Sequence, residues 1–343
     1  MKKILVVRYK FIGDMVLTVP FLRNLRYIYP DAQIDMLVAP NSGEIIENCP
    51  YINNFIYLYQ KKNKNGKLKK KSFFDYVNEI RKEKYDKAYV LKRSFSSALL
   101  CFLAGIKERV GFSTECRSFL LTKNIKYDRT KHESLCFLDV LEAEGFNVKD
   151  SYLENWIKEE NTSKIKQIFR DNSISDDIKK AVVNVTATNP GKVWDINNFA
   201  NVIEYLSNNK NVQVIYIGAP SDKIIYENIL FKNDLKIKPL NLCGQVSLQD
   251  SLALLREVDF VIGNDSGNLH MASSIGTKVI GLYGPMPFEK WKALGNGNIL
   301  LKADLPCMPC YLKGKCKHNK ACMNSITVKQ VENAIDCLLE GGK

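Results

Sequence analysis

Short apolar runs alternate with segments of helical periodicity in the first half of the chain. The apolar runs are Ile4–Val7, Ile34–Val38, Ile56–Tyr59 and Ala88–Leu91, and the helical segments include Val16–Tyr29 and Phe73–Arg81. Strands that read as continuous apolar runs are typical of parallel sheets covered by helices on both faces. The pattern therefore predicts an α/β domain.

The same alternation restarts in the second half. Strands are predicted at Ala181–Val185, Val212–Gly218, Phe260–Gly263 and Val279–Leu282, and helices near Asn197–Ser207, Ser221–Phe231, Ser247–Glu257 and Leu269–Ile275. A polar stretch at 159–180, relieved by an apolar cluster at 165–169, separates the two series. We predict domains at 1–170 and 178–326, with the boundary at about 165–180 and a last helix at 327–343.

Composition agrees with a folded globular protein, since 45% of the 343 residues are apolar and 25% are charged. The net charge of +13 is uneven: residues 1–155 hold 27 Lys and Arg against 18 Asp and Glu, and residues 156–343 hold 23 against 19. The first half should face the more anionic partner. The apolar run at the N-terminus stops at Arg8, too early for a signal peptide, so a cytoplasmic protein without a membrane span is expected.

The strongest candidate site is the segment 259–270, in which a buried strand ends in Asn264-Asp265-Ser266-Gly267 and opens a helix. A strand that turns into a helix directs backbone N–H groups and the positive helix end at a bound anion. Ser266 can cap the helix, and Gly267 lets a phosphate approach the backbone. The alternative is that Asp265 or Ser266 only caps a helix.

A second candidate follows the first strand, where Gly13 and Asp14 precede a helix. Open parallel sheets bind ligands outside the carboxyl ends of their strands, so a carboxylate there could act as a general base. The alternative for Asp14 is a helix N-cap.

Two further strand ends carry polar residues. Thr186, Thr188 and Lys192 follow the first strand of the second domain, and Lys192 could neutralise phosphate oxygens. Asp222, after the next strand, could cap a helix or accept hydrogen bonds from ribose hydroxyls. For Lys192 the alternative is an ordinary solvent-exposed lysine.

Together these segments resemble the bacterial heptosyltransferases of glycosyltransferase family 9, which move heptose from ADP-heptose to the lipopolysaccharide inner core. The similar motifs are Asn264–Gly267 with His270, then Gly276 and Leu282–Pro285, and also Arg8, Gly13, Asp14, Pro20, Arg109–Phe112 and His132. The resemblance implies two Rossmann-like domains facing across a cleft, the GT-B fold, with the acceptor in the first domain and the nucleotide-sugar in the second.

The resemblance also implies an inverting transfer, with Asp14 as the general base. Lys192 is the second predicted catalytic residue, meeting the charge of the departing diphosphate. Donor-binding residues are predicted at Gly13, Thr186, Thr188, Asp222, Asp265, Ser266, Gly267 and His270. Catalysis should need no cofactor, since the chain has no Asp-x-Asp triplet to hold a magnesium ion against the diphosphate.

Four cysteines form a second kind of candidate site. Cys307, Cys310, Cys316 and Cys322 have the spacing C-x2-C-x5-C-x5-C, which can close a tetrahedral site for structural zinc or iron. Four unliganded thiols are the alternative. His318 could substitute for one thiolate.

The segment 61–71 holds seven lysines and no acid. It is either a solvated loop or a clamp on an anionic glycolipid or glycan acceptor, at the cytoplasmic face of the inner membrane. Nucleic acid is not expected, because the run lacks interleaved aromatic residues.

Three other functions remain open. The first two are a GT-B transferase that uses another nucleotide-sugar and a non-catalytic relative. The third, less favoured, is a nucleic-acid-binding protein with a four-cysteine zinc ribbon. An oxidoreductase is disfavoured because no G-x-G-x-x-G follows a predicted strand.

Overall fold

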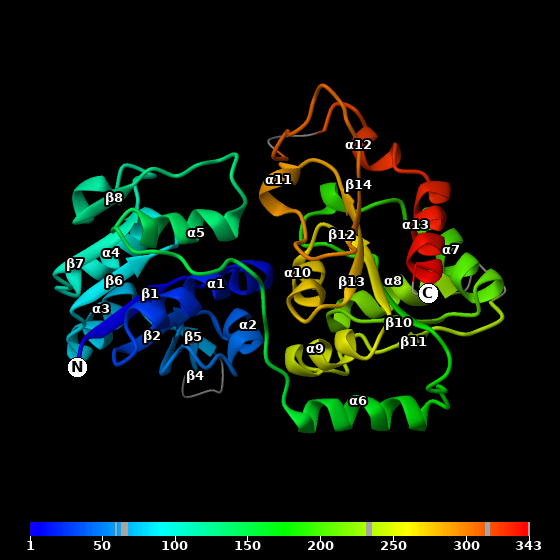
Figure 1. The fold of residues 1–343 in the computed structure, drawn as a ribbon, viewed down its shortest axis with the longest axis horizontal. Coiled ribbons are helices and arrows are strands. Elements are labelled where there is room, and N and C mark those ends of the chain that lie inside the picture. The colour runs from blue at the N-terminus through cyan, green and yellow to red at the C-terminus, as the bar shows by residue number, and fades with distance from the viewer. Residues whose placement is uncertain (59, 63–67, 231–234, 313–315, 342–343) are drawn as a thin grey trace. The chain divides into compact units, whose positions relative to one another are not determined.

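The computed structural model describes residues 1–58, 60–62, 68–230, 235–312 and 316–341. The chain divides into two compact units, Met1–Tyr152 and Leu153–Lys343 (Figure 1). Each unit is a parallel sheet with helices on both faces, so the predicted α/β class with two Rossmann-like domains is confirmed.

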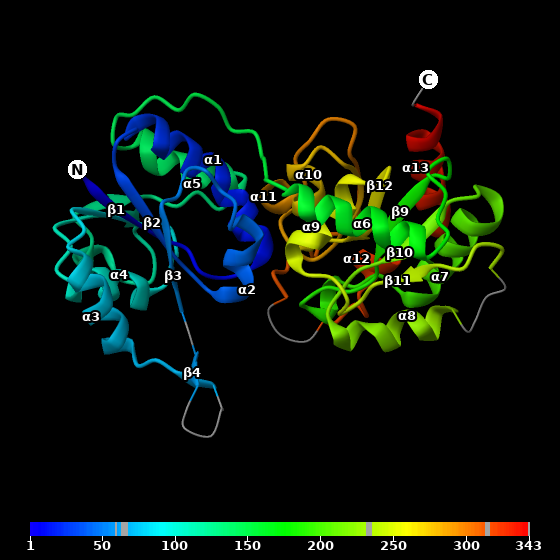
Figure 2. The same cartoon turned by 90° about the horizontal axis from the view of Figure 1, so that it is seen from below.

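The first unit contains a six-stranded parallel sheet of order β3-β2-β1-β6-β7-β8. Its strands are β1 (Lys3–Val7), β2 (Gln33–Val38), β3 (Asn54–Tyr57), β6 (Lys87–Val90), β7 (Glu108–Phe112) and β8 (Lys123–Ile125). Its helices are α1 (Ile12–Ile28), α2 (Pro40–Gly43), α3 (Phe73–Glu83), α4 (Phe95–Leu103) and α5 (Glu133–Glu142). Helices α1 and α5 pack together on one face and α3 and α4 on the other (Figure 2).

The second unit repeats this topology, with the order β11-β10-β9-β12-β13-β14. Its strands are β9 (Lys180–Asn184), β10 (Gln213–Tyr216), β11 (Leu240–Asn241), β12 (Phe260–Asn264), β13 (Lys278–Tyr283) and β14 (Ile299–Lys302). The main helices are α6 (Glu159–Asp171), α7 (Ile196–Glu204), α8 (Lys223–Leu230), α9 (Leu248–Arg256), α10 (Gly267–Ser274) and α13 (Val328–Glu340), with short helices α11 (Phe288–Trp291) and α12 (Ala321–Asn324).

Each sheet has one point where the strand order reverses. In the first unit the chain moves outward from β1 to β3, returns, and then moves the other way from β6 to β8. In the second unit the reversal lies between β9 and β12. In open α/β sheets the crevice at such a switch point is where ligands bind. The residues that follow β1, β6, β9 and β12 are therefore placed to form the sites.

The polar stretch in which the domain boundary is predicted contains a helix of the second unit. The polar stretch at 159–180 contains α6, which buries Ile165 and Phe169 and packs on α9. Its outer face is polar, which made the segment resemble a linker. Lys164 Nζ lies 2.5 Å and Asn161 Nδ2 2.9 Å from the carboxylate of Asp250 at the start of α9. The division after Tyr152 therefore precedes the predicted boundary at 165–180.

Two further predictions concern the last helix and the lysine-rich segment at 61–71. The last helix, α13, packs on α7 and buries Val331 and Ile335 in the core of the second unit. Part of the lysine-rich segment forms an antiparallel hairpin of β4 (Gln60–Lys62) and β5 (Leu68–Lys70), while 63–67 lie outside the described residues. In the described part of the chain, none of the helices has the length and apolar character that a membrane crossing requires.

Candidate active site

A buried ion pair lies where β1 ends in the first unit. Arg8 is the first residue after β1, and its Nη2 lies 2.5 Å from Oδ2 of Asp14 in the first turn of α1. The two residues are 3% and 7% exposed. Helix α1 begins after Phe11, whose φ of 65° is in the left-handed region. Phe11, and not Asp14, therefore occupies the N-cap position of α1.

Burial raises the pKa of the Asp14 carboxyl above its usual value. The charge of Arg8 opposes this, that of Glu133 adds to it, and those of Lys92 and Arg93 also oppose it. Because burial prevails, Asp14 is a stronger base than an exposed aspartate. A general base needs this property.

The cations Lys92 and Arg93 follow β6, on the other side of the switch point. The segment that carries them is held by Arg117, which is fully buried and donates to the carbonyl oxygens of Val90 (3.3 Å) and Ser94 (3.1 Å). Burial lowers the pKa of Arg117 to about 10. A buried guanidinium bonded to carbonyl oxygens in this way fixes the backbone from which Lys92 and Arg93 project.

The second unit has a comparable polar cluster at its own switch point. Lys192 Nζ lies 2.8 Å from Oδ2 of Asp265, the residue after β12. Asn184, at the end of β9, donates from Nδ2 to Oγ of Ser266 at 3.0 Å. Residues from the ends of both central strands thus meet beside the start of α10. Lys192 is not the solvated lysine of the alternative reading, since only 22% of its side chain is exposed.

Two neighbouring contacts position the loop after β9. Asn264, fully buried, accepts a hydrogen bond at Oδ1 from the backbone N–H of Trp194 and donates from Nδ2 to the carbonyl of Val185. Thr186 Oγ1 lies 3.4 Å from Oδ2 of Asp222. That oxygen also accepts from the backbone N–H of Ala219 at 2.9 Å, so Asp222 does serve the capping role.

Helix α10 begins at Gly267, two residues before the predicted start at Leu269. Ser266 occupies the N-cap position, but its side chain makes no cap hydrogen bond; its Oγ accepts a hydrogen bond from Nδ2 of Asn184 instead. Gly267 is the first helical residue. The first N–H groups of a helix have no acceptor within it, and they carry a partial positive charge. The start of α10 next to Lys192 is consequently suited to an anion.

The remaining predicted donor-binding residues are Thr188 and His270 in the second unit and Gly13 in the first. Thr188 is exposed, and His270 is buried at 4% exposure on α10. Gly13 belongs to the first unit, in the first turn of α1. The structure thus gathers Thr186, Lys192, Asp222, Asp265, Ser266 and Gly267 in one unit, and Asp14 in the other.

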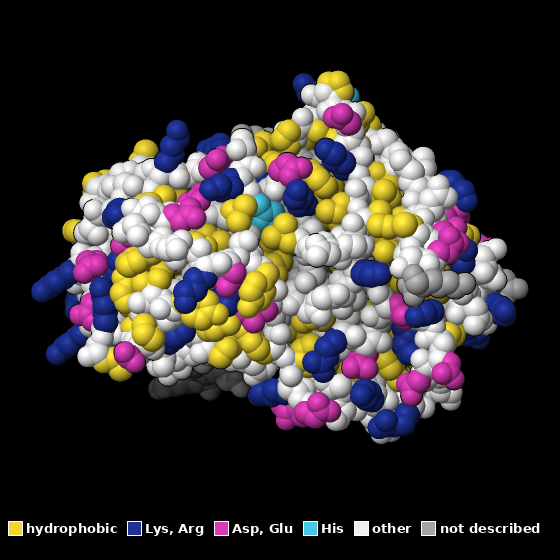
Figure 3. Space-filling view, viewed as in Figure 1, with side chains coloured by type: hydrophobic (Ala, Val, Ile, Leu, Met, Phe, Trp, Pro, Cys, Tyr) yellow, Lys and Arg dark blue, Asp and Glu magenta, His cyan; other side chains and the backbone are white. Residues whose placement is uncertain are grey.

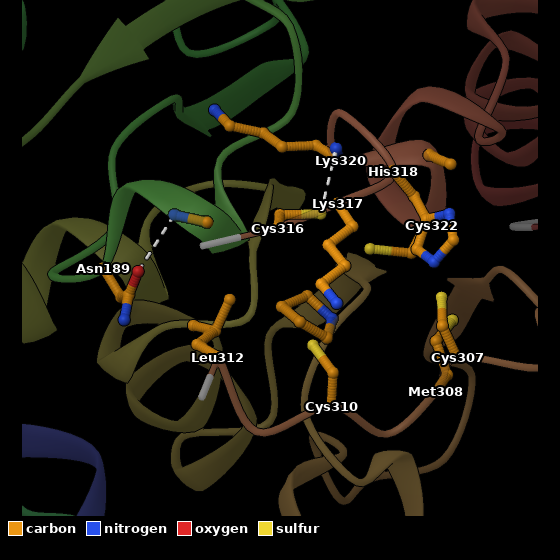
Figure 4. A pocket seen from close by; sticks show the side chains of 13 residues that line it. Asn189, Cys307, Met308, Cys310, Leu312, Cys316, Lys317, His318, Lys320 and Cys322 are labelled. Carbon is orange, nitrogen blue, oxygen red and sulfur yellow. Dashed lines mark hydrogen bonds between the residues drawn. The ribbon is translucent and has the colours of Figure 1, made fainter. Parts of the chain in front are cut away.

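The four predicted metal-ligating cysteines line one pocket of the second unit (Figure 4). Cys316 Sγ accepts a hydrogen bond from the backbone N–H of Lys320 at 3.4 Å, and His318 lies next to Cys322. Within the described ranges, no three His, Cys, Asp or Glu side chains are arranged to hold a metal ion. The loop is nevertheless close to the donor segment, because a Cβ on Gly191 would lie 2.4 Å from Cδ2 of Leu312.

Sequence reasoning missed several members of these clusters. Asn184, Lys92 and Arg93 stand at or just after a strand end, so the rule that ligands bind at carboxyl ends could have found them. Glu133 contacts Arg8 across a separation of 125 positions (133 − 8), and nothing local in the sequence signals that contact.

Comparison with known proteins agrees with this geometry. Residues 74–321 match the family model of glycosyltransferase family 9 (heptosyltransferase). The chain belongs to this family. It is therefore a glycosyltransferase, as predicted.

Individual relatives of this family 9 enzyme are distant in sequence. Lipopolysaccharide heptosyltransferase 3 of Escherichia coli is 26% identical over 346 residues, covering 96% of this chain and 97% of the relative. A family 9 glycosyltransferase from Veillonella parvula DSM 2008 has a TM-score of 0.87 at 24% identity, covering 99% and 98%. The E. coli ADP-heptose lipopolysaccharide heptosyltransferase II has a TM-score of 0.80 at 23% identity, covering 99% of each chain. These structures support the GT-B assignment.

Proposed function

We propose that this family 9 enzyme transfers heptose from ADP-heptose to a lipopolysaccharide-core or related glycan acceptor. The observation that carries the proposal is the pairing of a buried Asp14 with Arg8 at one switch point and of Lys192 with Asp265 at the other. The first cluster offers a base, and the second offers a cation and a helix start for a diphosphate. The named relatives use heptose, which supports the choice of sugar.

In the donor site, Lys192 and the first N–H groups of α10 bind the diphosphate. Lys192 is held by Asp265, so its ammonium is already oriented before the nucleotide-sugar arrives. Thr186 and Asp222 are near enough to one another to contact the same ribose. Fixed donors of this kind stabilise charge that develops on the leaving group, and each is worth several kcal/mol on the oxyanion-hole scale.

In the reaction, the Asp14 carboxylate takes the proton of the acceptor hydroxyl as its oxygen attacks the anomeric carbon. The bond from that carbon to the diphosphate oxygen breaks in the same displacement, and its electron pair leaves with ADP. Lys192 and the N–H groups of α10 stabilise the negative charge that develops on the departing diphosphate. The transfer therefore inverts the anomeric configuration and uses no cofactor.

The acceptor is proposed to be an anionic glycolipid or glycan at the cytoplasmic face of the inner membrane. The support is the greater positive charge of the first half of the chain and the lysines of the β4–β5 hairpin. On the face drawn in Figure 3, Lys and Arg side chains are dispersed among Asp and Glu rather than gathered in one stripe. A nucleic-acid-binding surface would present a basic stripe, and the described residues on this face present none.

The four cysteines are proposed to hold a structural zinc or iron ion. They are soft ligands that share one pocket, and the chemistry of four thiols fits either metal. Binding requires the thiols to draw closer together than they lie in the structure. The ion would have a structural role, stabilising the loop that lies against Gly191.

Replacing Asp14 with Asn tests the base. Because general-base catalysis contributes about 10²–10⁴-fold, kcat for Asp14→Asn should fall by about that factor in a coupled assay of ADP release. ADP affinity, measured by calorimetry, should stay within about twofold, since the Asp14 carboxylate is not part of the donor site. The matched control is Asp35→Asn, which alters a buried carboxylate on β2 that Tyr85 hydrogen-bonds. Full activity of Asp14→Asn contradicts the assignment.

Replacing Lys192 with Met tests the donor site. The loss of one charge-assisted contact should weaken ADP binding about tenfold to a hundredfold, or about 1.4–2.8 kcal/mol. Lys179→Met is the control. Lys179 is the residue before β9, and it pairs with Asp259 rather than Asp265. Equal ADP affinities for Lys192→Met and Lys179→Met would rule out the proposed role.

Elemental analysis tests the metal site. Protein purified without chelator should contain about one zinc or iron per chain, and Cys310→Ser should lose it because three thiolates hold an ion less well than four. Cys337→Ser, which changes an exposed cysteine on α13, is the control and should retain the metal. Metal-free wild-type protein would refute the site.

A further inference from the structure

Glu133 is a fully buried carboxylate that the proposed mechanism does not use. It is the first residue of α5. Its Oε2 accepts a hydrogen bond from the hydroxyl of Tyr127 at 2.5 Å, and its Oε1 lies 3.9 Å from Arg8 Nη2 and 3.6 Å from Arg93 Nη2. Burying an anion is costly unless it is paired, and these groups offset that cost for Glu133.

The two carboxylates Glu133 and Asp14 share one guanidinium. The same Nη2 atom of Arg8 lies 2.5 Å from Asp14 and 3.9 Å from Glu133. The other charged groups that act on Asp14 are Lys92 and Arg93, which follow β6. His132, the N-cap residue of α5, directs Nδ1 to the hydroxyl of Ser134 at 2.8 Å. Glu133 is thus a second anion beside Asp14 in this cluster, and it faces the guanidinium groups of Arg8 and Arg93.

We propose that Glu133 is a positioning residue for the transfer reaction. Glu133 shares Arg8 with Asp14, so the guanidinium does not pair with the Asp14 carboxylate alone. A carboxylate fully neutralised by an arginine is a weak base, because the cation favours its ionised form. A second anion on the same guanidinium offsets that effect. The inference rests on the proposed function, since it concerns the strength of the base.

Glu133→Gln removes the charge but keeps the shape of the side chain. In the wild-type enzyme, activity should rise with pH as Asp14 loses its proton. Without the negative charge of Glu133, Asp14 ionises at lower pH, so the acidic limb of the kcat profile should move to lower pH. The weaker base should also lower the plateau of kcat about threefold to tenfold. A merely structural role would reduce the melting temperature without moving the limb.

Two other variants complete the test. Glu133→Asp keeps the charge, and its acidic limb should lie nearer to the wild-type position than that of Glu133→Gln. Arg93→Met removes a cation whose side chain is 32% exposed, so it should fold and should move the limb to higher pH. An unmoved or oppositely moved limb in Glu133→Gln overturns the inference. If Glu133→Gln does not fold, an unmoved limb in Arg93→Met overturns it.

The outcomes separate this inference from the proposed function. If wild-type protein shows no transfer from ADP-heptose, the proposed function fails. If wild type is active and Asp14→Asn is not, while the limbs of Glu133→Gln and Arg93→Met coincide with that of wild type, the transferase mechanism stands and only the role of Glu133 is rejected.

Discussion

The ion pair between Arg8 and Asp14 lies after β1, at the switch point of the first sheet, and the charged groups around it fix the properties of this site. Two charges taken out of water require partners and fixed geometry. Glu133, the first residue of α5, lies 3.9 Å from Arg8 and accepts a hydrogen bond from Tyr127, and Arg117 fixes the backbone after β6. The Asp14 carboxyl consequently lies in a buried environment that raises its pKa above the usual value.

The second sheet carries a different polar cluster at its own switch point, between β9 and β12. Asn184 and Asn264, both buried at the ends of β9 and β12, tie the loop after β9 to the start of α10. Lys192 is thereby held against Asp265. The first unit therefore gathers several charges around one acid, whereas the second aligns one cation with a helix start. These arrangements correspond to the two requirements of sugar transfer, a base for the acceptor and stabilisation of the leaving group.

Much of this could be predicted from the sequence, because parallel strands carry a strong apolar signal and their carboxyl ends carry polar residues. The central strands β1, β2, β9, β12 and β13 were predicted within about two residues of their ends. The identity of α6 was not, since its polar outer face outweighs the two apolar residues, Ile165 and Phe169, that hold it to α9. Glu133 was missed because its contacts join residues distant in the chain.

In the proposed reaction a single displacement transfers the sugar, and Asp14 activates the acceptor hydroxyl. The stereochemistry of the product tests this claim most directly. The enzyme would be supplied with ADP-heptose and a glycan acceptor, and the anomeric configuration of the new linkage would be determined by NMR. We predict a configuration opposite to that of the donor. Retention of the donor configuration would contradict the account.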